Sequence, residues 1–103
     1  MKLMTNNLLM ARVYQLRIAQ GLLQKVVAQG LGIAPPLYSK IEKGERSLQY
    51  EYLKPLSSIL NVDVKEFSSL WLTDKILYYA PDVSTDVVSE VALIIKKIKN
   101  DNK

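Results

Sequence analysis

The 103-residue sequence contains neither cysteine nor histidine, and these two absences exclude several kinds of site. Without cysteine the chain has no disulfide, no thiolate metal ligand and no cysteine nucleophile, and its composition suits a reducing cytosol. Without histidine it lacks the commonest general base and the commonest zinc ligand. The carboxylates are not clustered either. We therefore expect no enzyme activity, no metal site and no cofactor.

Long apolar runs are also missing from the sequence. No run approaches the length that is needed to span a bilayer. The first ten residues, MKLMTNNLLM, are interrupted by Thr5, Asn6 and Asn7, which does not fit a signal peptide. We expect a cytoplasmic protein without membrane contact, and 103 residues are enough for one core but not for two.

Acidic residues are absent before Glu42, and the charge is therefore uneven along the chain. Residues 1–46 include seven basic and two acidic residues, whereas residues 47–103 include seven basic and eight acidic residues. The net charge of +4 thus comes from the first half. A basic segment of this kind suits a polyanion, through salt-sensitive contacts with phosphates. Charge alone fits a merely solvated basic surface equally well.

The segment from residue 20 to residue 46 has the spacing of two short helices joined by a tight turn. Gly32 separates the two helices, because a glycine adopts positive φ at no steric cost and ends a helix abruptly. Apolar residues recur at helical spacing on both sides of the turn, at Leu23, Val26, Val27, Leu31, Ile33, Leu37, Tyr38 and Ile41. The second helix presents Ser39, Lys40 and Lys43 away from its apolar side. A short basic helix of this kind fits the major groove of DNA.

At these residues the sequence resembles the Cro and lambda-repressor-like helix-turn-helix family, of the xenobiotic-response-element type. The matching residues are Gly21-Leu22, Gln24, Ala28, Leu31-Gly32-Ile33 and Ser39 to Arg46 (SKIEKGER). The resemblance covers about residues 7–67. It implies an all-α fold, with a lambda-repressor-like five-helix domain over residues 1–67. We expect residues 68–103 to form a C-terminal helical extension packed on the same core.

Capping residues and prolines predict where the helices begin and end. We expect helices at residues 7–20, 23 to 29 or 30, 35–43, 53–60, 63–79 and 85–99, with Asn6 or Asn7 capping the first. The clearest start is Asp63 to Glu66, which has the pattern of a capping box, with Val62 and Phe67 as its hydrophobic staple.

Arg17 and Glu42 match positions that form a buried ion pair between the first and third helices in the family. We expect both residues to be structural and not to contact DNA.

The resemblance also implies contacts with the DNA backbone. Gln24 opens the second helix, where the family glutamine binds a phosphate at the positive end of the helix dipole. The alternative for Gln24 is a role in helix capping. Lys43 and Arg46 flank the glycine after the third helix, at positions where the family contacts the backbone. Solvated charge is the alternative for these two residues.

Base contacts are implied at Pro35, Pro36, Ser39 and Lys40. Proline has no side-chain donor or acceptor, so the two prolines offer at most an apolar contact, for example with a thymine methyl. The alternative is that they only shape the start of the helix. Hydrogen-bonded recognition then falls to Lys40, for which guanine is the expected base, with Ser39 assisting.

The chain after Phe67 holds more apolar side chains than a five-helix domain needs. Leu72, Ile76 and Tyr79 lie on a different side of their helix from Phe67 and Trp71, and one apolar face is left over. Because this fold binds two half-sites with two subunits, we expect a homodimer with its interface in residues 67–99. A protein partner at the C-terminal helices, such as a toxin, is the alternative.

The sequence therefore predicts a DNA-binding transcriptional regulator that occupies an operator in double-stranded DNA. Two alternatives remain open. One is a DNA-binding antitoxin whose C-terminal helices cover a toxin. The other is a protein-binding adaptor that keeps the fold without binding DNA, which the two prolines favour.

Overall fold

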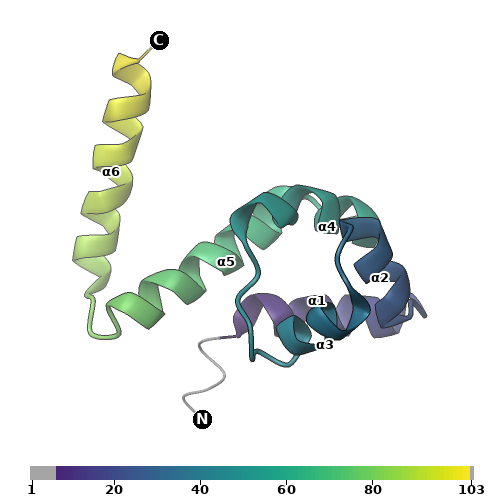
Figure 1. Ribbon diagram of the computed structural model, residues 1–103. Helices are drawn as coiled ribbons and strands as arrows, with labels where there is room; N and C mark the ends of the chain where they lie inside the picture. Colours follow the sequence, from purple (N-terminus) through teal and green to yellow (C-terminus); the bar gives the residue numbers. More distant parts are fainter. Residues whose placement is uncertain (1–6, 103) are drawn as a thin grey trace.

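The computed structural model describes residues 7–102, and this part of the chain is all helical (Figure 1). Its elements are α1 (Leu8–Ala19), α2 (Gln24–Leu31), α3 (Pro35–Glu42), the 3₁₀ helix η2 (Tyr50–Tyr52), α4 (Leu53–Leu60), α5 (Val64–Tyr79) and α6 (Thr85–Asp101). The all-α fold expected from the sequence is confirmed. The helix bounds agree with the expected ones to within two residues, and α4 agrees at both ends with Pro55 in its first turn.

Helices α1 to α5 pack around one core. Helix α1 lies against α3, α4 and α5, α2 lies against α3 and α4, and α4 lies against α5. The largest fully buried side chains include Tyr38, Phe67, Leu53, Leu56 and Leu60. Burying an apolar side chain of this size contributes about 1.5–3 kcal/mol. The five helices therefore form a domain that supplies its own stability.

The N-terminus of α1 is capped by a residue from α5. Asn7 occupies the N-cap position, as expected, but its side chain makes no capping hydrogen bond. The Asp74 carboxylate instead accepts from the backbone N–H groups of Leu8 and Leu9, at 3.0 and 3.1 Å. A carboxylate here also faces the positive end of the helix dipole. Asn6, the other expected cap, lies outside the described residues.

A side-chain N-cap forms at the start of α5, but the expected capping box does not. Asp63 is the N-cap, and its carboxylate accepts from the backbone N–H of Lys65 at 2.9 Å. The Glu66 carboxylate does not complete the box but pairs with Arg12 of α1. A guanidinium is a stronger partner for a carboxylate than a neutral backbone N–H. The expected start of α5 and its N-cap Asp63 are confirmed, whereas the expected capping box was wrong, because Asp63 bonds to Lys65 and Glu66 bonds to Arg12.

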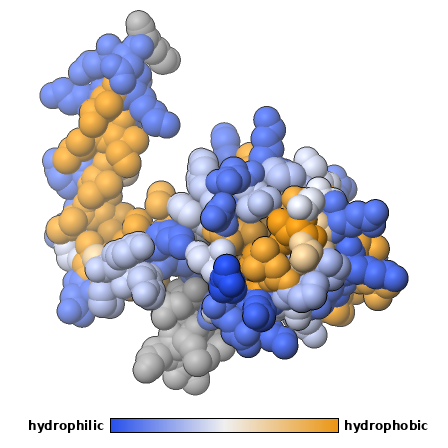
Figure 2. Space-filling view, in the orientation of Figure 1, coloured by the Kyte–Doolittle hydropathy of each residue, from blue (hydrophilic) through white to orange (hydrophobic). Residues whose placement is uncertain are grey.

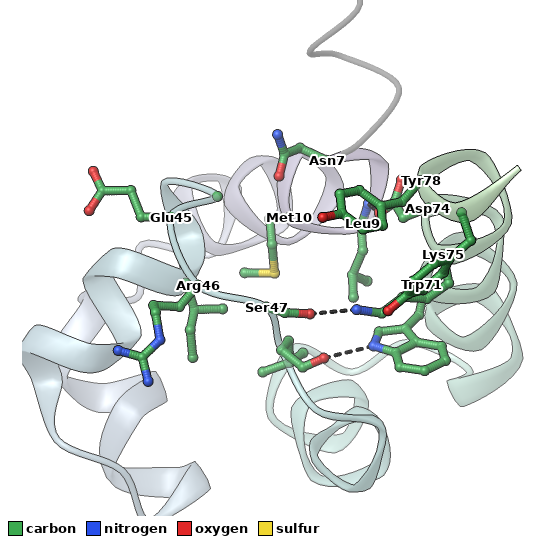
Figure 3. A pocket seen from close by; sticks show the side chains of 14 residues that line it. Asn7, Leu9, Met10, Glu45, Arg46, Ser47, Trp71, Asp74, Lys75 and Tyr78 are labelled. Atoms are coloured by element: carbon green, nitrogen blue, oxygen red, sulfur yellow. Dashed lines mark hydrogen bonds between the residues drawn. The ribbon is translucent and has the colours of Figure 1, made fainter. Parts of the chain in front are cut away.

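The middle of α5 also holds the loop that follows α3 (Figure 3). The Trp71 indole N–H donates to the carbonyl of Leu48 at 2.7 Å, and the Lys75 ammonium donates to the Ser47 hydroxyl at 2.6 Å. A cavity of about 480 Å³ lies beside these contacts, lined by α1, the loop and α5. Residues beyond 67 are therefore part of the domain, and the boundary expected after residue 67 falls inside a continuous helix.

Helix α6 lies apart from the core. The chain turns after α5, and α6 extends away from the other helices (Figure 1). None of its residues is buried. The expectation that α6 packs on the same core was therefore wrong. A continuous apolar strip bordered by hydrophilic residues runs along α6 (Figure 2). Within residues 7–102, no helix is both long and apolar enough to cross a membrane.

Candidate nucleic-acid interface

The turn between α2 and α3 depends on Gly32, which caps α2 in the left-handed conformation with φ +73°. A Cβ at this position would meet no atom within 4 Å, so the backbone angle and not space calls for glycine. The N–H groups of Gly32 and Ile33 close α2 on the carbonyls of Gln29 and Ala28. Helix α3 then begins within three residues and in a new direction.

One side of α3 is buried and the other is exposed. Tyr38 and Ile41 are buried in the core. The residues on the other side are Pro35, Pro36 and Lys40, which are exposed, and Ser39, which is half-buried. The two prolines occupy the first two positions of the helix, where no intrahelical partner exists for an N–H. The first turns of α3 are therefore held by the core while their outer side is open.

The backbone turns again at Gly44, directly after α3. Gly44 has φ +84°, and a Cβ there would come within 2.6 Å of the Asn7 side chain. The N–H of Glu45 returns to the carbonyl of Lys40 at 2.9 Å, which closes the end of the helix. Lys43 and Arg46 stand on either side of this turn, and both are exposed.

A buried network centred on Glu42 fixes α3 to α1. The Arg17 guanidinium donates two hydrogen bonds to the two oxygens of Glu42, each at 2.8 Å, and a third to the carbonyl of Leu22. The side chains of Arg17 and Glu42 are 8% and 4% exposed. The Tyr38 hydroxyl donates to the same carboxylate at 2.7 Å. The expected buried ion pair is confirmed, and its partners are fully hydrogen-bonded.

Burial and hydrogen bonding have opposite effects on the pKa values of Glu42 and Arg17, but they act in the same direction on Tyr38. Burial alone raises the pKa of the Glu42 carboxyl, but hydrogen bonds from Arg17, Tyr38 and Gln24 outweigh it and leave the pKa below its ordinary value. The hydrogen bond with Glu42 raises the pKa of the Arg17 guanidinium. Burial, and then the bond to Glu42, raises the pKa of the Tyr38 hydroxyl. Glu42 and Arg17 therefore stay charged and Tyr38 stays neutral at neutral pH.

Gln24 is the first residue of α2, and its side chain joins this network. The Gln24 amide donates to Glu42 at 2.8 Å, across 18 residues of sequence. An amide nitrogen has two hydrogens, so one donor remains after this bond is made. The N–H of Val26 already donates to the carbonyl of Leu23 at 3.0 Å. The N–H groups of the first two residues of α2 lack intrahelical partners, and the N-cap Leu23 supplies no side-chain bond to them. The start of α2 can therefore still accept an anion.

The positive charge of the first half is divided between two uses. Arg12 and Arg17 are paired with carboxylates inside the domain. Lys25, Lys40, Lys43 and Arg46 are exposed, and the acidic Glu45 lies between the last two. The exposed cations thus belong to the two helices of the turn and to the loop after them.

The family model for helix-turn-helix proteins of the lambda-repressor and Cro type matches residues 13–67. The chain belongs to this helix-turn-helix family. The match does not specify the xenobiotic-response-element type. No curated protein and no solved structure gives a significant match.

The helix-turn-helix match places the chain in a family of DNA-binding regulators that are generally not enzymes. The match ends at residue 67, twelve residues before the end of α5, and it leaves α6 outside. The exposed side of α3 described above lies within the matched residues.

The helix-turn-helix geometry groups the residues expected at DNA. Pro35, Pro36, Ser39 and Lys40 share α3, and Lys43 and Arg46 follow it. Sequence reasoning missed that Tyr38 and Gln24 both bind Glu42. The spacing of Tyr38 and Glu42, four residues apart on one helix, was a usable signal. The bond from Gln24 has no local signal, because it depends on how α2 meets α3.

Proposed function

We propose that this chain is a cytoplasmic, sequence-specific transcriptional regulator that occupies an operator in double-stranded DNA as a homodimer. The observation that supports this most directly is the construction of α3. Its inner side is fixed by Tyr38, Ile41 and the Glu42 network, while its first turns are exposed beside exposed lysines. A helix presented in this way is suited to insertion in the major groove.

Contacts with the DNA backbone are proposed for Gln24, Lys43 and Arg46. The remaining amide donor of Gln24 and the N–H groups of the first two residues of α2 suit one phosphate. The two exposed cations on either side of Gly44 suit phosphates on the far side of the groove. These contacts supply affinity and orientation but not base preference.

Base recognition is proposed for Lys40, with Ser39 assisting. Lys40 is exposed and has a long side chain that reaches the N7 and O6 acceptors of guanine. Pro35 and Pro36 are exposed at the helix start and can contact only apolar groups such as a thymine methyl. The small number of donors on this face predicts modest specificity for one half-site, so that two half-sites are needed.

The direct test is selection of bound sites from a random duplex pool, followed by titration of the best site at several salt concentrations. Lys40→Ala should cost about 1–3 kcal/mol at one base pair of each half-site and should change the selected base there. Lys43→Ala is the matched control, because it removes a neighbouring exposed lysine. It should weaken all duplexes about equally and reduce the salt slope by about one unit.

Two results would count against this proposal. If no duplex binds even at low salt, the chain is an adaptor for another protein, as the two exposed prolines would allow. If Lys40→Ala and wild type select identical sites, Lys40 contacts only the backbone. An antitoxin role would instead require a toxin that binds the C-terminal helices while DNA binding persists.

A further inference from the structure

Helix α6 presents an unpartnered apolar face with a regular repeat. Val87, Val91, Ile94 and Ile98 follow one another at spacings of four, three and four residues, which places them in one line along the helix. Val88 and Ile95 widen this line on one flank. All six side chains are between 37% and 54% exposed. This strip is the apolar surface on α6 in Figure 2.

The composition of α6 indicates that this face is covered in solution. Seven of its seventeen residues are β-branched, and such residues are poor helix formers without packing. Helices of this length are marginal in water unless an amphipathic face is buried. Since no residue of α6 is buried within the described residues 7–102, a second molecule is the cover that we consider.

The charges of α6 favour a second copy of the same helix as the cover. Glu90 and Lys97 are seven residues apart and therefore border the same flank of the apolar face. In an antiparallel pair centred between Val91 and Ile94, Glu90 lies beside the partner's Lys97, and the twofold axis repeats the pair. A parallel pair would instead place Glu90 beside the apolar flank of the partner.

The bend between α5 and α6 supplies a place for the end of the partner helix. A cavity of about 400 Å³ lies there, and its lining is almost wholly apolar, with Ile76, Tyr79 and Val83 beside Val87, Val88 and Val91 of α6. In the antiparallel arrangement, the partner's Ile98 lies opposite Val87 and the partner's Ile95 lies beside Val88. The same arrangement therefore matches the charged flank and fills the cavity.

We propose that two copies of this chain associate through antiparallel pairing of their α6 helices, with the last isoleucines of each entering the bend of the other. This pairing deepens the proposed function, on which it rests for the use of a dimer, because a twofold pair presents two α3 helices to two half-sites. The pairing itself is a property of the protein without DNA.

Sedimentation equilibrium of the full chain without DNA tests the pairing. Wild type should be dimeric at micromolar concentration. Ile94→Lys places a charge at the centre of the seam in both subunits and should weaken dimerisation by about a hundredfold or more. Leu93→Lys is the matched control, since Leu93 is the adjacent residue and lies off the apolar line. It should change the dimer dissociation constant by less than about threefold.

A charge exchange tests the antiparallel direction. Glu90→Lys and Lys97→Glu should each weaken the dimer by about tenfold, because each creates two like-charge contacts. The double exchange should restore the wild-type constant to within about threefold. A wild-type chain that is monomeric at high micromolar concentration overturns the proposal, as does a double exchange that restores nothing.

A DNA measurement separates this proposal from the proposed function. The Ile94→Lys monomer should still bind a duplex that carries one half-site at low salt. If the Ile94→Lys variant dimerises as strongly as wild type does, and the wild-type chain binds operator DNA, the pairing is wrong and the DNA function stands. If the charge exchange behaves as expected but no duplex binds, the pairing stands and the DNA function is wrong.

Discussion

The five-helix domain and α6 obtain their stability in different ways. Helices α1 to α5 share a core and are joined by long-range side-chain bonds, such as Asp74 with the start of α1 and Trp71 with Leu48. Helix α6 has regular caps and a regular apolar repeat, yet it buries no residue within the chain. Local helix signals are therefore present in both regions, whereas burial is completed in one region only.

This contrast separates two properties that one short chain combines. Changes in the domain should alter folding and DNA binding, and changes in α6 should alter association. A truncation, two ion-pair variants and acid each test whether stability belongs to the five-helix domain alone, in order of decreasing effect on the free energy of unfolding.

The largest effect is expected from the position of a truncation. A chain that stops after Ala80 loses α6 but keeps every buried residue, and it should remain a folded monomer. A chain that stops after Phe67 also loses Trp71 and the Asp74 cap of α1, and it should lose about 4 kcal/mol or more of a typical 5–15 kcal/mol. Urea unfolding followed by circular dichroism measures the free energy of unfolding of each truncated chain. Equal stability of the two truncated chains would show that the boundary lies at residue 67 after all.

The next effect, of similar size or smaller, is expected from the two ion pairs of α1. Glu42→Ala leaves the buried Arg17 charge without its partner and should cost about 3–5 kcal/mol. Glu66→Ala breaks the pair with Arg12, whose members are 38% and 37% exposed, and should cost less than about 1 kcal/mol. Denaturant midpoints of the two variants give the comparison directly. Similar losses in both would mean that burial does not decide the contribution of these pairs.

The smallest effect is expected from acid. The pKa of Glu42 is lower in the folded chain than its ordinary value of 4.5. The ionised carboxylate therefore stabilises the fold above that ordinary value, and this contribution disappears as the pH falls through the folded value. Glu42→Gln should flatten the acid side of the stability curve, both in the full chain and in the chain that stops after Ala80. Unfolding midpoints measured from about pH 6 to pH 2 provide the test. If the acid sides of the wild-type and Glu42→Gln curves have the same slope, another carboxyl is responsible.

The sequence predicted the helices well because their ends are set by nearby residues. Pro55 marked the first turn of α4, Asp63 marked the start of α5, and Gly32 marked the turn before α3. Proline, glycine and short polar caps act within a few residues of themselves. Such signals can be recognised without the tertiary structure.

The sequence did not predict the contacts that depend on tertiary packing. Nothing near Asp74 indicates that it caps a helix that begins 66 residues earlier. Glu66 fitted a capping box but meets Arg12 once α1 and α5 pack together. The proposed contacts with DNA also depend on packing between distant groups, here between the protein and a DNA duplex, and they stay predictions.

Because no side chain of α6 takes part in the core, the length of this helix can change without altering the domain. Each added residue lengthens a helix by about 1.5 Å, and seven residues add about 10.5 Å while returning the apolar line to nearly the same side. In an antiparallel pair, that increment moves the two domains apart by roughly three base pairs of DNA. The length of α6 would then set the distance between the two half-sites. Related chains with a longer or shorter α6 would bind operators of different spacing, while α3 and its base preference stayed the same.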